Sequence, residues 1–245
     1  MKPFLILQLR PETDASDDEY AAILDKCGLT PEQTRRIRVD RENIPQDLDV
    51  TEFAGVIVGG GPGCVSDAPD EKSAQDARSE SQIMALMPQI TARDHPFMGC
   101  CYGLGILAHH LGAEVSKARY GEPVGPTVCE ATQAAATDPL LAGLETQFEV
   151  FVGHKEAVQA VPDGAVHLLR SKGCPVQMIR HGHNVYATQF HPEADAHDFE
   201  RRIQVYRNHG YFPPQDVERL IEACHASDVH VPGVILRRFA QRYGG

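Results

Sequence analysis

The sequence predicts an α/β protein with an open, mostly parallel sheet that carries helices on both faces. Apolar runs that suit buried strands occur at 3–9, 55–58 and 96–100, and helical stretches lie between them. That alternation is typical of a parallel sheet covered on both sides. Beyond residue 113, strand candidates follow one another with only short turns between them, which predicts antiparallel additions. These candidates lie at 126–131, 148–152, 165–170, 175–180 and 184–190.

Helical spacing of apolar residues predicts the remaining elements. A first helix covers 18–27 and ends at Gly28, and a second covers 70–92. After residue 195 the chain is helical again. We therefore expect a main domain at 1–195 and a helical C-terminal extension at 196–245 that packs on it.

The predicted extension carries one apolar side. This stripe, from 199 to 239, is expected to pack either on the sheet or on a second copy of the chain, as a homodimer. The adjacent arginines Arg201 and Arg202 are expected on the solvent-facing side of their helix.

Composition and charge exclude several classes of protein. The 245 residues include 23 basic and 34 acidic ones, a net charge of −11, which disfavours a nucleic acid or an anionic membrane as the main partner. No apolar run approaches the roughly 18 residues that span a membrane, and the apolar start is too short for a secretory signal. Seven cysteines without a Cys-x-x-Cys pair favour reduced thiols in a cytoplasm.

A cysteine version of a nucleophile elbow is the clearest chemical motif. A predicted buried strand runs into Gly99-Cys100-Cys101-Tyr102-Gly103, and an apolar helix start follows. Glycines at 99 and 103 suit a sharp strand-to-helix turn, because a Cβ there would collide with neighbouring backbone. The turn would lift the Cys101 thiol above the sheet at a helix N-terminus, where the partial positive charge favours a thiolate. Cys100 would point back into the fold.

His191 is the best candidate base among the twelve histidines. It ends the apolar strand at 185–190, and ligands of open α/β sheets bind outside the carboxyl ends of the strands. An elbow after one parallel strand and a histidine after another can meet at that edge. Glu193, two residues further on, can hold the imidazole in the required tautomer. The predicted triad is Cys101, His191 and Glu193.

A glycine-rich loop at 59–63 directly follows the strand at 55–58. Bare N–H groups in such a loop can receive an anion. The loop lacks both the Gly-Lys-Ser/Thr of a phosphate-binding loop and the Gly-x-Gly-x-x-Gly spacing of a dinucleotide site. We therefore expect it to line an oxyanion hole.

These three motifs, in this order, resemble those of the class I glutamine amidotransferases, and in particular the glutaminase domain of guanosine monophosphate synthetase. The resemblance covers about residues 50–195 and includes Gln189-Phe190-His191-Pro192-Glu193. It implies a flavodoxin-like fold and an enzyme that releases ammonia from the γ-amide of glutamine. The reaction would pass through a γ-glutamyl thioester on Cys101. His191 would move the proton, and Glu193 would orient the His191 imidazole.

The resemblance also implies the residues around the nucleophile. The N–H groups of Gly61 and Tyr102 would form the oxyanion hole, and Gly60 would shape the loop. The segment at 151–156 resembles the family's segment that lines the glutamine pocket, which makes His154 a candidate for substrate binding.

Two positions depart from the family pattern. The family commonly continues the elbow as Gly-His-Gln, whereas Leu104 and Gly105 follow Gly103 here. Gly105 therefore lacks the side chain that helps to form the glutamine pocket. One alternative is a γ-glutamyl peptide hydrolase with the same triad. A non-enzymatic alternative is a degenerate amidotransferase fold that senses glutamine or joins a synthetase complex.

We expect neither a metal nor an organic cofactor. Neighbouring histidines such as His109 and His110, on otherwise unrelated segments, do not define a tetrahedral metal site. The expected ligand is glutamine or another γ-glutamyl compound. Because no acceptor domain with its own phosphate loop is evident, the ammonia would pass to a separate synthetase, or the enzyme would act as a hydrolase alone.

Overall fold

The computed structural model describes residues 2–245, in which eleven strands and six α-helices are formed. The strands are β1 (Phe4–Gln8), β2 (Thr34–Arg38), β3 (Val56–Val58), β4 (Phe97–Cys100), β5 (Val115–Ser116), β6 (Glu122–Ala131), β7 (Gln147–His154), β8 (Ala157–Val158), β9 (Ala165–Ser171), β10 (Met178–His181) and β11 (Val185–Thr188). The helices are α1 (Thr13–Cys27), α2 (Ala74–Ala92), α3 (Tyr102–His110), α4 (Ala196–Tyr206), α5 (Val217–His225) and α6 (Val231–Tyr243).

Nine strands form one sheet in the order β2-β1-β3-β4-β11-β10-β9-β6-β7. The first five of these are parallel to one another, and the other four add on in antiparallel fashion. The predicted α/β class, with antiparallel additions, is confirmed. In the centre of the sheet, β4 lies between β3 and β11, and Cys100 is opposite Thr188. The elbow and the predicted base therefore leave neighbouring strands at the same edge.

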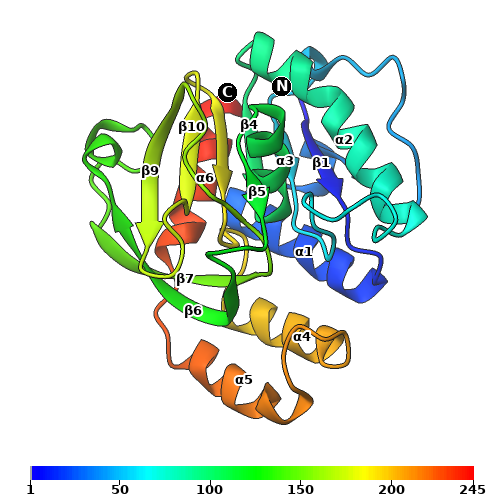
Figure 1. Cartoon of the computed structure of the whole chain (residues 1–245). Helices are drawn as coiled ribbons and strands as arrows, with labels where there is room; N and C mark the ends of the chain where they lie inside the picture. The colour runs from blue at the N-terminus through cyan, green and yellow to red at the C-terminus, as the bar shows by residue number, and fades with distance from the viewer. Residues whose placement is uncertain (1) are drawn as a thin grey trace.

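Helices cover both faces of the sheet, as Figure 1 shows. Side chains alternate along β1, so that Leu5 and Leu7 pack in one apolar cluster and Phe4 and Ile6 in another. The first cluster includes the buried faces of α2 and α3, and the second includes those of α1 and α6. Because both faces are buried, the strand reads as a continuous apolar run, which is the pattern that predicted it.

The C-terminal helices pack in two different places. Helix α6 lies against α1 and belongs to the main core, where Phe239 contacts Phe4 with ring centroids 6.2 Å apart. Helices α4 and α5 form a smaller apolar cluster beside β6 and β7 (Figure 1), and Phe199 stacks on Phe151 at 4.8 Å. The division at residue 195 stays a prediction.

The sequence analysis did not predict β2. Its sequence, Thr-Arg-Arg-Ile-Arg, has a single buried apolar side chain, Ile37, because the strand lies at the edge of the sheet. Edge strands commonly carry charged side chains, which hide the apolar pattern. The two-residue strands β5 and β8, which pair with each other, were also too short to predict. Within residues 2–245, no helix combines the length and the apolar character that a membrane crossing requires.

Candidate active site

A strained turn carries Cys101 between β4 and α3. Cys101 has φ +52° and ψ −95°, and its N–H donates to the Thr188 carbonyl at 2.7 Å. A Cβ on Gly99 would lie 2.7 Å from the carbonyl carbon of Gly103, so the turn excludes any side chain at position 99. Cys100 packs in the apolar cluster on the α1 and α6 face. The predicted elbow geometry is present, with the Cys101 thiol at the sheet edge.

His191 and Glu193 follow β11 at the same edge. The Nδ1 atom of His191 lies 2.9 Å from Oε1 of Glu193, and the His191 N–H donates to the Phe151 carbonyl at 3.0 Å. An ionised carboxylate can only accept, so Nδ1 carries the proton and Nε2 keeps its lone pair. Cys101 and His191 line one cavity. The structure therefore brings the three predicted triad residues together.

Arg202 on α4 is a fourth charged residue at this site. Its Nη1 lies 2.9 Å from Glu193 Oε1, and the two side chains are 6% and 0% exposed. The expectation that Arg202 faces solvent is wrong, although Arg201 does so with 56% of its side chain exposed. Position decides this difference, because residue 202 lies on the helix face of Phe199 and residue 201 does not. The three-residue spacing between Phe199 and Arg202 was the feature of the sequence that could have predicted the burial of Arg202.

Burial controls the protonation of the triad. It raises the pKa of the Cys101 thiol to about 12, against the opposing charge of Arg10, so the resting side chain is a neutral thiol. In the free protein, burial thus opposes the thiolate that the helix N-terminus favours. Burial lowers the pKa of His191 below 6.5 despite Glu193, which leaves a neutral imidazole ready to accept a proton. Burial opposes ionisation of Glu193, but Arg202 and His191 outweigh it and keep its pKa low.

The glycine loop lies beside the turn. A Cβ on Gly60 would be 2.8 Å from His191 Cε1 and equally close to Arg10 Nη2, so only glycine lets both side chains approach. A Cβ on Gly61 would contact the Tyr102 ring at 3.6 Å. Tyr102 is the first residue of α3, where the N–H has no acceptor within the helix. Gly61 and Tyr102 line the same cavity as Cys101, and Gly60 lies against His191, so the oxyanion hole stays a prediction.

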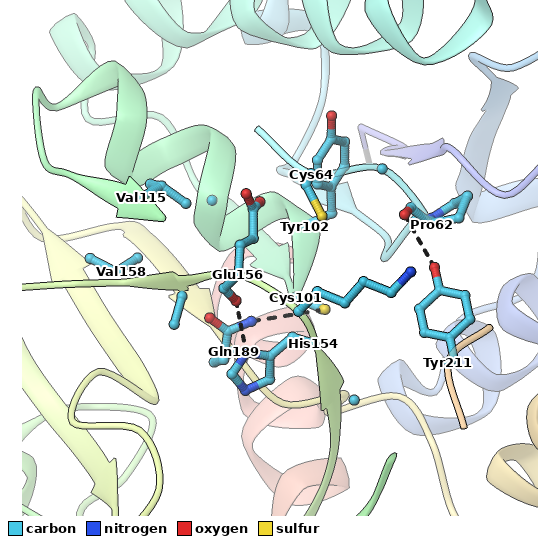
Figure 2. A pocket seen from close by; sticks show the side chains of 16 residues that line it. Pro62, Cys64, Cys101, Tyr102, Val115, His154, Glu156, Val158, Gln189 and Tyr211 are labelled. Atoms are coloured by element: carbon cyan, nitrogen blue, oxygen red, sulfur yellow. Dashed lines mark hydrogen bonds between the residues drawn. The ribbon is translucent and has the colours of Figure 1, made fainter. Parts of the chain in front are cut away.

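One cavity next to Cys101 is shown in Figure 2, and we call it the Glu156 cavity. It encloses about 410 Å³, including space open to solvent, between the glycine loop, the start of α3 and the segment after β7. Gln189 Nε2 lies 3.9 Å from the Cys101 sulfur (Figure 2). On the opposite side, the Tyr211 hydroxyl donates to the Pro62 carbonyl at 3.1 Å.

His154 forms part of the wall of this cavity. Its Nδ1 donates to the Glu156 carbonyl at 2.8 Å, and its Nε2 lies 3.1 Å from Glu122 Oε2. Burial opposes ionisation of Glu122, but His154 outweighs it and lowers the carboxyl pKa. Both ring nitrogens of His154 already have partners in the protein. His154 therefore supports the wall of the cavity and offers no free ring nitrogen to a ligand.

Glu156 occupies the space above Gly105. A Cβ on Gly105 would lie 3.1 Å from Glu156 Oε1 and 3.2 Å from Val65 Cγ2. The carboxylate accepts hydrogen bonds from the Val65 and Ser66 N–H groups, each at 2.8 Å. The sequence analysis did not single out Glu156, although it lies in the segment at 151–156. In this chain a carboxylate from that segment takes the room that a side chain at 105 would need.

A second cavity, which we call the Arg202 cavity, lies on the His191 side of Cys101. It encloses about 450 Å³, again including space open to solvent. Its walls come from the turn that carries Cys101, from α4 and from the segment that follows α4. They include Arg10, Phe199, Arg202, Ile203, Tyr206 and Phe212.

Comparisons with known proteins show the family to which the chain belongs. The family model described as "Glutamine amidotransferase class-I" matches residues 32–204. A GMP synthase [glutamine-hydrolyzing] from Thermomicrobium roseum is 32% identical over 170 residues, which are 67% of this chain and 29% of that protein. A protein from Thermoplasma volcanium, named as one subunit of a glutamine-hydrolyzing GMP synthase, is 29% identical over 191 residues, which are 76% of this chain and 86% of that protein. The chain thus spans less than a third of the first relative.

Solved structures share the fold. A glutamine amidotransferase from Thermotoga maritima superposes with a TM-score of 0.78 at 19% identity, covering 99% of this chain and 98% of that one. A glutamine amido transferase from Methylobacillus flagellatus gives a TM-score of 0.71 at 22% identity, covering 99% and 92%. At these identities the likeness establishes the architecture, and the chemistry has to be argued from the side chains.

Proposed function

The chain belongs to the class I glutamine amidotransferase family, and on that premise we propose that it hydrolyses the γ-amide of glutamine with the triad Cys101, His191 and Glu193. The observation that carries the proposal is the shared cavity, which Cys101 and His191 both line, with His191 Nδ1 held by the Glu193 carboxylate. A degenerate binding fold would have no use for this arrangement of nucleophile, base and orienting group.

The first half-reaction forms the thioester. As the Cys101 sulfur attacks the γ-carbonyl carbon, its proton moves to His191 Nε2, because the resting thiol is neutral. The carbonyl oxygen becomes an oxyanion that the N–H groups of Gly61 and Tyr102 receive. His191 then gives the proton to the amide nitrogen, the carbon–nitrogen bond breaks, and ammonia leaves. The γ-glutamyl group remains on sulfur.

The second half-reaction returns the enzyme to its starting state. A water molecule attacks the thioester carbon while His191 accepts one of its protons. The carbon–sulfur bond breaks, glutamate is released, and the proton returns to Cys101. Glu193 holds the same imidazole tautomer in both halves and stabilises the transient imidazolium.

We infer that the Glu156 cavity holds the amino-acid end of glutamine. It presents one negative side chain, Glu156, and one positive side chain, Lys155, whose Nζ lies 4.3 Å from the centre of the Tyr211 ring. Lys155 has no ion-pair partner within the described residues. A free amino acid carries an ammonium and a carboxylate, so the two charges complement its head.

Ammonia release from L-glutamine by the purified chain tests the proposal, with Cys101→Ala as the blank. The wild type should release ammonia and glutamate in equal amounts, and acid quenching should trap a γ-glutamyl adduct on the peptide that contains Cys101. Equal release by both proteins, or an adduct on another cysteine, would contradict the assignment. A folded wild type that neither releases ammonia nor forms an adduct would favour the binding-protein alternative.

We further propose that a separate protein uses the ammonia. Relatives that are named as single subunits of a GMP synthase match this chain over most of their length, 86% in the Thermoplasma volcanium protein, which supports a free-standing glutaminase. Co-purification of the chain with an ATP-dependent synthetase, together with a higher glutaminase rate in that complex, would test this step.

A further inference from the structure

Helices α4 and α5 bring three side chains that can bind a metal ion together on the surface of the protein. His197 and Glu200 lie three residues apart on α4, so they leave neighbouring turns of the helix. His225 is the last residue of α5. The two helices lie side by side (Figure 1) and share an apolar cluster that includes Phe199 and Cys224, the chain neighbours of Glu200 and His225. This packing places the three polar side chains next to one another.

The polar atoms of these three residues converge on one point. His225 Nε2 lies 2.7 Å from Glu200 Oε2, and the ring centroids of His197 and His225 are 5.0 Å apart. One ligand atom from each residue lies within 4.8 Å of the other two. Nitrogen and oxygen ligands of a tetrahedral zinc ion lie about 3.4 Å apart, so small side-chain rotations would close the three residues around one ion.

The surroundings of the three side chains permit those rotations. The side chains of His225 and Glu200 are 37% and 36% exposed, and His197 is also exposed. Water can therefore reach the same point and fill the remaining coordination position. None of the three residues lines the Glu156 cavity or the Arg202 cavity, so the cluster lies apart from the nucleophile.

The types of ligand indicate the class of ion. Imidazole nitrogens suit zinc and other divalent transition metals, whereas Mg²⁺ and Ca²⁺ prefer oxygen ligands. The Glu200 carboxylate adds a negative charge that offsets part of the charge of the ion. A hydrogen bond between Glu200 and His225 alone would leave out His197, whose ring nitrogens have no hydrogen-bond partner within residues 2–245.

We propose that His197, Glu200 and His225 form a binding site for a divalent transition metal ion, with Zn²⁺ as the ion and water as its fourth ligand. The ion cross-links α4 to α5. The inference goes beyond the proposed glutaminase activity and does not depend on it, because none of the three residues takes part in that reaction. The sequence analysis expected no metal, since it considered histidines that are close in sequence, whereas His197 and His225 belong to different helices.

Calorimetric titration with Zn²⁺ tests the site. The full chain with Cys101→Ala is used, so that the active-site thiol cannot compete for the ion. We expect one Zn²⁺ per chain, and an affinity that falls at least about tenfold with Glu200→Gln and with His225→Ala. These positions are at the surface, so both variants should fold. Absence of Zn²⁺ binding, or an affinity unchanged by both substitutions, would overturn the inference.

His230→Ala is the matched control. His230 Nδ1 lies 2.9 Å from Asp228 Oδ1, which reproduces the histidine–carboxylate pair, but among the described residues no second imidazole converges on it. The Zn²⁺ affinity of this variant should equal that of the parent chain. An equal loss of affinity in His230→Ala and His225→Ala would mean that Zn²⁺ binds exposed histidines in general, and the inference would be wrong.

Two other ions check the chemistry of the site. Mg²⁺ should not displace Zn²⁺, because the site offers two nitrogen ligands. Co²⁺, which can replace Zn²⁺, should give a visible spectrum without the near-ultraviolet band of a thiolate–metal bond. Displacement by Mg²⁺ at a concentration similar to that of Zn²⁺ would indicate a site of carboxylates alone. A thiolate band would place the ion on a cysteine. Either result would overturn the assignment.

Discussion

The Glu156 cavity and the Arg202 cavity share Cys101, but they are built from different parts of the chain. All residues that line the Glu156 cavity lie within the family match at 32–204, except Tyr211. The Arg202 cavity also uses Arg10, Tyr206 and Phe212, which lie outside that match. The contrast indicates that the walls of the Glu156 cavity belong almost entirely to the part matched by the family model, while the Arg202 cavity also needs residues from before and after that part.

The largest effect is expected from replacing Cys101, which lines both cavities. Cys101→Ala should lower kcat/KM for every γ-glutamyl substrate by at least about 10³-fold, because no other group can form the thioester. Thermal unfolding should change little, since the turn itself is retained. Steady-state kinetics and a melting curve check both points.

The neighbouring cysteine gives a matched control. Cys100 is fully buried on the opposite face of the sheet, so Cys100→Ala should cost about 1 kcal/mol of unfolding free energy and leave the rate nearly unchanged. If Cys100→Ala also abolished turnover, the assignment of the nucleophile within the Cys100–Cys101 pair would be wrong.

Arg202→Met removes the buried cation beside Glu193 in the wall of the Arg202 cavity. Arg202 is one of the charges that lower the pKa of His191, and it also neutralises Glu193. Without it the imidazole holds its proton more tightly, so its pKa rises. Because the neutral imidazole is the base, the acid limb of the kcat/KM profile should move to higher pH, by about one unit. Glu193, left with the His191 hydrogen bond but without its buried cation, should also destabilise the fold by about 3 kcal/mol.

Arg201→Met makes the same change one residue away. Arg201 is mostly exposed and pairs with Asp18 and Asp198 on the outer side of α4. The pH profile of kcat/KM for Arg201→Met should match that of the wild type. Equal shifts in the two variants would mean that net charge, and not the contact with Glu193, sets the pKa of His191.

Glu156→Gln changes the Glu156 cavity and leaves the lining of the Arg202 cavity intact. Loss of the carboxylate should raise KM for glutamine by about tenfold with a smaller change in kcat, since the ammonium of the substrate loses its partner. Glutaramate, which is glutamine without the α-amino group, provides the comparison. The wild type should prefer glutamine to glutaramate, and the variant should lose most of that preference. An unchanged preference would place the ammonium elsewhere.

Gly105→Ala should have the smallest effect. Its Cβ would lie 3.1 Å from Glu156 Oε1, which two backbone N–H groups hold in place, so the cavity narrows slightly. We expect KM for glutamine to rise about threefold. The gain in helix propensity, up to about 1 kcal/mol, should offset the crowding in a thermal melt. A lower KM would show that glycine is not needed at this position.

The sequence by itself determined the central strands of this protein and the turn that carries Cys101. Apolar runs at 3–9, 55–58 and 96–100 predicted the central strands, because strands buried on both faces leave a continuous apolar signal. The glycines at 99 and 103 predicted the elbow, and at position 99 only a residue without a Cβ fits. These features are local, so neighbouring residues along the chain were enough to show them.

Only the tertiary structure decided the charges and the second cavity. Arg202 reaches Glu193 because α4 packs at the sheet edge, and Arg10, which pairs with Glu19 of α1, lies against Gly60. Burial by surrounding segments raises the pKa of the Cys101 thiol, and the motif alone does not show that burial. Electrostatic energies depend on distance and burial in three dimensions, so a motif can identify a nucleophile without giving its protonation state.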